Sequence, residues 1–182
     1  LNLRAIWAFG FEMDYTLVHY EVEAWERHAF HHAVRALERE GWPTESLRFD
    51  PGMMTRGLVV DTELGNVVKA NRFGFVKQAF HGTGPLDYDE VRERYARVIV
   101  DLAEPRWEFM NTLFSMSDAC LYAQLVDVLD RGGQLPGIFG YADLYAKVRA
   151  TVDLAHLEGN LKGDIVAEPD RFVVLDPEAV LA

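Results

Sequence analysis

The sequence of 182 residues contains a single cysteine, Cys120, which cannot form a disulfide within the chain. This near-absence of cysteine excludes a small fold held together by disulfides. Cys120 lies in an apolar stretch with a helical pattern and is most simply a small core residue. We therefore expect a cytoplasmic protein.

Long apolar runs are also absent. None approaches the length of a transmembrane helix, and the N-terminus lacks the basic and apolar regions of a secretory signal. We therefore expect no membrane partner. The first residue is leucine rather than methionine, so we expect a processed or excised piece, or an incompletely described chain.

Basic residues are scarce as well. The chain has 18 Lys and Arg against 29 Asp and Glu, a formal net charge of −11. Duplex nucleic acid binds basic faces, so this balance argues against such a partner. It does not exclude a nucleotide, because one cation and a few local Lys or Arg residues can hold a phosphate. The apolar content of 49% is typical of a globular protein.

The most informative segment is an apolar run that ends in two carboxylates. Residues 4–11 are apolar and aromatic and predict a buried strand, which Glu12 and Asp14 follow one residue apart. Two like charges this close oppose joint ionisation. Carboxylate oxygens are ligands that Mg²⁺ prefers, and α/β sheets bind ligands beyond the carboxyl ends of their strands. We therefore expect a Mg²⁺ site and phosphate chemistry here.

The remaining pattern predicts short elements bounded by turn and capping residues. The expected helices cover 21–41, about 88–98, 121–129 and 141–157, and the expected strands cover 56–61, 66–71 and 172–175. The two strands within 56–71 predict a hairpin. We expect a first strand with the acid loop (1–20) and then a mostly helical region that resembles an inserted cap (21–175). The resemblance described next implies that 176–182 start a return to the core.

Residues 9–20, Phe-Gly-Phe-Glu-Met-Asp-Tyr-Thr-Leu-Val-His-Tyr, resemble motif I of the haloacid dehalogenase (HAD) superfamily. They resemble more narrowly the cytosolic purine 5′-nucleotidase group of the IMP–GMP-specific type, whose motif reads Asp-Met-Asp-Tyr-Thr-Leu. Residues 55–69, 111–114 and 148–162 look like that group's cap segments. The resemblance implies an α/β, HAD-like (Rossmann-like) core represented by its first strand, with a largely helical α+β cap insertion. The later core strands would be absent from this chain.

The same resemblance implies hydrolysis of purine nucleoside 5′-monophosphates such as IMP and GMP through a carboxyl-phosphate intermediate. In that group the first acid of motif I is the nucleophile and the second is the general acid/base. By position these would be Glu12 and Asp14. Both side chains and the Met13 carbonyl would hold Mg²⁺.

The resemblance also implies a set of nucleotide-contacting cap residues. These are Asn111, Phe114, Arg149, Asp153, His156 and Lys162, with Phe114 stacked on the purine. The spacing of Arg149, Asp153 and His156 places them on one helix face. On spacing alone, a surface ion pair beside a satisfied histidine is the simpler interpretation.

Two departures argue against activity. Glu12 stands where the group has Asp, and its extra methylene moves the reactive oxygen by about 1 Å. The later HAD motifs are not in this sequence. We therefore expect the chain to be inactive or nearly so by itself, with a second chain or a further C-terminal segment completing the core.

Other interpretations stay open. The first alternative is a non-catalytic interaction or nucleotide-binding subunit derived from this family. The second is a HAD phosphatase for another phosphomonoester. Either could form a homo-oligomer.

Three histidines, His28, His31 and His32, fall on one predicted helix. They suggest zinc, but the sequence shows neither a fourth ligand nor a supporting cysteine. We therefore expect exposed helix residues there.

Overall fold

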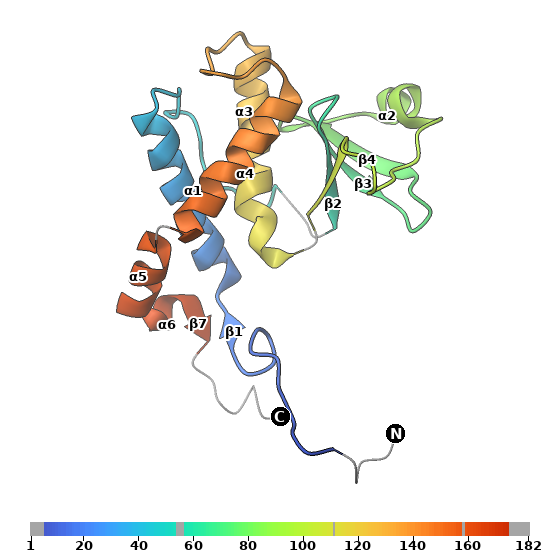
Figure 1. The fold of residues 1–182 in the computed structure, drawn as a ribbon. Helices are drawn as coiled ribbons and strands as arrows, with labels where there is room; N and C mark the ends of the chain where they lie inside the picture. The colour runs from blue at the N-terminus through green and yellow to red at the C-terminus, as the bar shows by residue number, and fades with distance from the viewer. Residues whose placement is uncertain (1–5, 54–56, 111, 158, 175–182) are drawn as a thin grey trace.

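The computed structural model describes residues 6–53, 57–110, 112–157 and 159–174. Three helices, α1 (Val22–Arg39), α3 (Met116–Asp130) and α4 (Tyr141–Leu157), pack side by side, and an antiparallel sheet lies beside them (Figure 1). Within the described ranges, no helix is long and apolar enough to cross a membrane. The predicted segment 176–182 lies outside the described residues.

The three long helices follow from local apolar periodicity. In α1, Ala29, Ala33 and Leu37 recur every four residues and are fully buried. They pack in one core with α3 and α4, so the predicted helices over 21–41 and 141–157 are confirmed. Helix α3 begins earlier than the predicted 121–129, at Met116.

The predicted hairpin is confirmed but belongs to a larger sheet. In the part of the chain that the structure describes, five strands pair antiparallel in the order β5-β4-β3-β2-β6. Their bounds are β2 Leu58–Asp61, β3 Asn66–Ala70, β4 Val76–His81, β5 Gly84–Pro85 and β6 Trp107–Met110. Val60 on β2 lies opposite Val67 on β3 and Glu108 on β6.

Alternate residues of the central strands enter two different cores. Val60 and Val67 pack with the three long helices, whereas Val59 and Val68 pack with Tyr95 of α2 (Tyr88–Tyr95). A capping box of Asp87 and Glu90 starts α2. The sheet thus contributes to both cores, and β6 does so through buried Met110 in the first and buried Trp107 in the second.

The β2–β3 turn requires glycine at one position. Gly65 has φ +68°, and a Cβ there would lie 2.6 Å from the Tyr141 ring. A larger residue would be strained in that backbone region and would also displace α4 from the hairpin.

The predicted buried strand over residues 4–11 is wrong for its described part. Residues 6–11 have no regular secondary structure, and Trp7 is 98% exposed. A strand needs hydrogen-bonding neighbours, and none of the strands in the described ranges pairs with this segment. The observed sheets are antiparallel rather than a parallel Rossmann-like sheet.

The acid loop is tied to the C-terminal part of the described chain. β1 (His19–Tyr20) pairs antiparallel with β7 (Val173–Val174), where the sequence predicts a strand over 172–175. β7 directly follows α6 (Pro169–Phe172), which itself follows α5 (Asn160–Ala167). The Glu21 amide donates to the Phe172 carbonyl at 3.0 Å and extends the connection. The loop of residues 12–18 is therefore held at the lower end of the helical layer (Figure 1).

A buried glutamate joins α1 to the start of α3. Glu26 is fully buried, and its Oε2 accepts a hydrogen bond from the Ser117 amide at 2.7 Å. This bond satisfies an amide that the first turn of a helix leaves without a partner. Glu26 Oε1 has no hydrogen-bond partner among the described residues. Burial raises the pKa of Glu26 to about 7, although the Ser117 bond opposes that change.

The protonation of Glu26 makes folding stability depend on pH. The unfolded chain releases this proton near its ordinary pKa of 4.5, whereas the folded chain keeps it up to about pH 7. Stability is therefore expected to fall by roughly 3 kcal/mol between these pH values and to level off above them. Urea unfolding across this range should show a flatter profile for Glu26→Gln than for the wild type. Glu23→Gln, an exposed change on the same helix, should keep the wild-type profile. Parallel profiles for Glu26→Gln and the wild type would contradict the assignment.

Candidate functional site

A cavity of about 390 Å³ opens where α3, α4 and β6 meet. Its size is that of ordinary small-molecule sites. The 3₁₀ turn η2 (Leu113–Ser115) joins these elements at its rim. The cavity is lined by Glu108, Phe109, Thr112, Phe114, Ser115, Asp118, Tyr145, Arg149, Val152, Asp153 and His156.

Four of the residues predicted to contact a nucleotide line this cavity. They are Phe114 from the turn and Arg149, Asp153 and His156 from one face of α4. Lys162 is exposed on α5 and is not part of the lining. Asn111 lies outside the described residues, but its neighbour Thr112 lines the cavity.

Arg149 is held by carboxylates on both sides. Its Nη1 lies 2.9 Å from Asp118 Oδ2, and its Nε lies 3.3 Å from Asp153 Oδ2. Asp118 is 1% exposed, whereas the Arg149 side chain is 50% exposed. Burial raises the pKa of Asp118 to about 6, and the positive charge of Arg149 limits that rise. The pair fixes the guanidinium at the cavity wall and leaves one of its faces open to a ligand.

His156 lies one turn beyond Asp153 on the same wall. Burial lowers the pKa of His156, the positive charges of Lys162 and Arg149 lower it further, and Asp153 opposes them. The imidazole is thus neutral at neutral pH and can both donate and accept a hydrogen bond.

An aromatic cluster joins the acid loop to the cavity. The Phe114 ring centre lies 5.5 Å from that of Trp25, 5.6 Å from that of Tyr20 and 6.3 Å from that of Tyr15. Tyr15 and Tyr20 belong to the segment that follows the two predicted catalytic acids. The acid loop therefore packs on one side of Phe114, and Phe114 also lines the cavity.

The three predicted metal-ligating residues lie in this loop. Asp14 Oδ1 accepts a hydrogen bond from the Tyr20 hydroxyl at 2.5 Å, and this bond raises the pKa of Tyr20 to about 12. The Met13 carbonyl accepts backbone hydrogen bonds from Leu17 and Val18 at 3.0 and 2.9 Å. Glu12 is exposed. The two carboxylates fit a hard cation, whereas the Met13 carbonyl is engaged in its own turn.

Sequence reasoning missed Asp118, the most deeply buried charge at the cavity. A usable signal was present, because Asp118 is the one charged residue in the otherwise mostly apolar run from 116 to 126. It also lies only four residues after Phe114, which the resemblance had already marked as a site residue. Tyr145 was missed too, although it lies four residues before Arg149.

A cavity lined mainly by charged and polar groups around an aromatic ring can hold a small polar organic molecule. The comparison with protein families agrees with this class. The family model described as the 5′ nucleotidase family matches residues 1–182, so the chain belongs to the 5′ nucleotidase family.

Individual relatives are distant and longer. A 5′-nucleotidase domain-containing protein of Dictyostelium discoideum is 25% identical over 176 residues, covering 92% of this chain and 29% of that protein. The 5′-nucleotidase domain-containing protein 1 of Bos taurus and that of Homo sapiens are each 25% identical, and each match covers 98% of this chain and 43% of the relative. The chain thus spans less than half the length of these curated relatives.

The Asp118–Arg149 pair gives a pH-dependent stability prediction. Arg149→Gln leaves a buried carboxylate without its positive partner, so unfolding free energy should fall by about 1–3 kcal/mol at pH 8. The loss should be smaller at pH 5, where Asp118, whose pKa is about 6, is largely protonated. Urea denaturation at both pH values measures this. Arg171→Gln, which removes an exposed pair with Glu168, should change stability by less than about 0.5 kcal/mol. Equal losses for Arg149→Gln at the two pH values would show that Asp118 does not depend on Arg149.

Proposed function

We propose that this chain forms the nucleotide-recognising part of a HAD-type 5′-nucleotidase that acts on purine nucleoside 5′-monophosphates. One observation carries the proposal: Phe114, Arg149, Asp153 and His156, chosen from the sequence by resemblance, line a single cavity. Helical spacing alone groups the three residues of α4, so the informative part is that Phe114, from a separate turn, lines the same cavity. Family membership supports the same reaction class.

The charges of the cavity suggest which end of the nucleotide it takes. Three carboxylates, of Glu108, Asp118 and Asp153, face one arginine and a histidine that burial keeps neutral. Such a wall disfavours a phosphate dianion and favours groups that donate hydrogen bonds. The nucleoside would therefore occupy the cavity. Its base would lie against Phe114, and its N–H and hydroxyl groups would face the carboxylates.

The phosphate would then lie toward the acid loop, which packs on the other side of Phe114 through Tyr15 and Tyr20. Glu12 and Asp14 are the residues that would hold Mg²⁺ there. Bound Mg²⁺ would neutralise phosphate charge beside the two carboxylates. The hydrogen bond from Tyr20 engages Oδ1 of Asp14, so Oδ2 would contact Mg²⁺ only while Asp14 is ionised and would carry the proton when Asp14 acts as the general acid.

In the proposed reaction, Glu12 and Asp14 carry out the hydrolysis in two steps. The Glu12 carboxylate attacks phosphorus and forms a carboxyl-phosphate, while the bond to the ribose O5′ breaks and Asp14 gives its proton to that oxygen. Asp14 then takes a proton from water as the water oxygen attacks phosphorus, and the Glu12 carboxylate is released. The extra methylene of glutamate displaces the attacking oxygen by about 1 Å, which can cost on the order of 100-fold in rate.

The main alternative is a nucleotide-binding or interaction subunit without turnover. Glu12, which stands at the position of the nucleophilic aspartate, specifically favours this alternative. Both functions require the same nucleoside cavity, so binding and turnover must be measured separately.

Nucleotide binding is tested with a matched pair of phenylalanine variants. Isothermal titration calorimetry with GMP should show binding to the full chain, and Phe114→Ala should weaken it by about 5- to 150-fold through lost stacking. Phe139→Ala, at a residue that is almost fully exposed, should bind like the wild type. No GMP binding to the wild type, or equal binding by both variants, would contradict the proposed cavity.

Turnover is tested by phosphate release from IMP and GMP with Mg²⁺. The 182-residue chain by itself is expected to release little phosphate, and robust turnover would overturn that expectation. In the complete protein, Glu12→Asp should raise the rate by more than about tenfold, because it restores the reach of the nucleophile. No change would show that Glu12 is not at the nucleophile position.

A further inference from the structure

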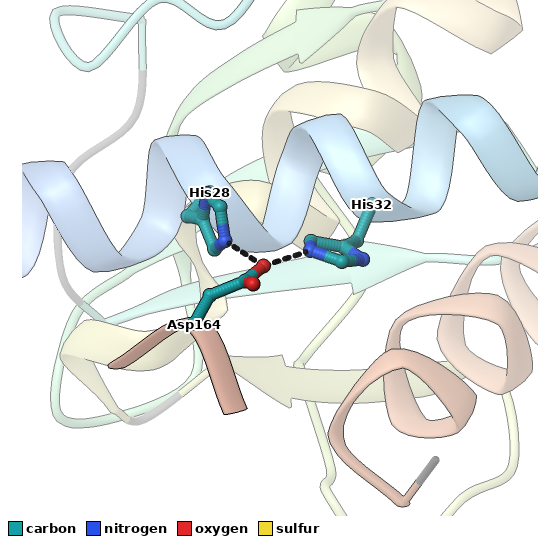
Figure 2. Close-up of side chains that lie close together, drawn as sticks. All are labelled: His28, His32 and Asp164. Carbon is teal, nitrogen blue, oxygen red and sulfur yellow. Dashed lines mark hydrogen bonds and ion pairs between the residues drawn. The ribbon is translucent and has the colours of Figure 1, made fainter. Parts of the chain in front are cut away.

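Two histidines one turn apart on α1 converge on an aspartate of α5. The Nε2 atoms of His28 and His32 lie 2.7 and 3.1 Å from the same atom, Asp164 Oδ2 (Figure 2). The histidine side chains are 15% and 16% exposed, and that of Asp164 is 52% exposed. This arrangement corrects the expectation of exposed helix residues for His28 and His32, whereas His31 is exposed as predicted.

The arrangement comes from helix geometry. Positions four apart on a helix share one face, so the rings of His28 and His32 stand together, with centres 4.8 Å apart. The ring of Phe172 lies 5.3 Å from that of His28 and limits its freedom. The third group is Asp164 of α5, which lies 132 residues after His32 in the sequence. Its carboxylate reaches the gap between the two rings.

The spacing of the three groups suits a small transition-metal ion. One ligand atom from each residue lies within 4.8 Å of the others. In a tetrahedral zinc site with bonds of about 2.0–2.1 Å, ligand atoms stand roughly 3.3 Å apart. A small rotation of the half-exposed Asp164 side chain would open the two short contacts to that distance.

We propose that His28, His32 and Asp164 form a binding site for one divalent transition-metal ion of the zinc class. Water completes the coordination, because the carboxylate side of the site is open to solvent. Two imidazoles, one carboxylate and an open position make up a known type of zinc-ligand set. The site is separate from Glu12 and Asp14 and does not depend on the proposed nucleotidase function.

The ligand atoms select against a hard cation. Arg35 and Arg39 line the same surface hollow as His32 and Asp164, with Glu38 as a further acid. Their positive charge opposes any divalent cation equally, so the choice between ions depends on the ligand atoms. Imidazole nitrogens bind zinc by donation of a lone pair, and they suit zinc far better than they suit Mg²⁺. The site should therefore bind Zn²⁺ in the presence of excess Mg²⁺.

Metal binding would bridge α1 and α5. α5 starts after Gly159, which has φ +77°, and it carries Lys162 two residues before Asp164. A metal at this site would hold α5 on α1 and would thereby restrict Lys162 near His156. An ion that binds only the folded chain also raises the unfolding temperature.

The test is titration of the full chain, without a histidine tag, with zinc chloride in excess Mg²⁺. Calorimetry should show one Zn²⁺ per chain, and Zn²⁺ should raise Tm. Loss of even an outer partner of a metal ligand weakens binding by 10- to 100-fold in typical sites. His28→Gln, His32→Gln and Asp164→Asn should therefore each weaken binding by at least about tenfold.

His31→Gln is the matched control, because it removes a histidine of the same helix that lies outside the cluster. It should leave affinity and the Tm shift unchanged. Asp164→Asn keeps the test valid if a histidine variant fails to fold, since Asp164 is half-exposed and the change is nearly isosteric. The proposal is overturned if the wild type binds no stoichiometric Zn²⁺, if Asp164→Asn binds like the wild type, or if His31→Gln weakens binding equally.

Discussion

The buried carboxylate of Asp118 is the constraint on which the candidate site depends. A charge with so little access to water needs a partner, and Arg149 from the neighbouring helix supplies it at 2.9 Å. That contact links α3 to α4 at the point where the cavity opens. It also holds Arg149 in the wall, so the site is arranged before any ligand arrives and a ligand need not order it.

The acid loop depends on the same region. Its aromatic residues pack on Phe114, whose turn leads directly into α3. The strand pair of His19–Tyr20 with Val173–Val174 holds the loop from the other side. Phe114 thus contacts the acid loop and also lines the cavity. This connection gives a physical reason for placing nucleoside recognition and phosphate chemistry next to each other.

The sequence predicted what local patterns determine. Helix α4 was predicted to its ends because its apolar residues follow helical spacing and glycine stops it. Strand β6 was not predicted, because its partner β2 lies far back along the chain. Strand β4 pairs with neighbouring β3, but Lys77 and Gln78 interrupt its apolar pattern. The family resemblance predicted Arg149 as a site residue but did not predict its buried partner Asp118. The meeting of His28 with Asp164 spans 136 residues, so no local pattern could predict it.

The central claim is that the cavity beside Asp118 and Arg149 binds a purine nucleoside monophosphate. NMR titration of the isotope-labelled chain with GMP tests this claim most directly, because it maps the bound ligand residue by residue. The account predicts that amide shifts concentrate at Phe114, at Asp118 and along 149–156 of α4. Shifts confined to other surfaces, or no shifts at saturating GMP, would contradict it.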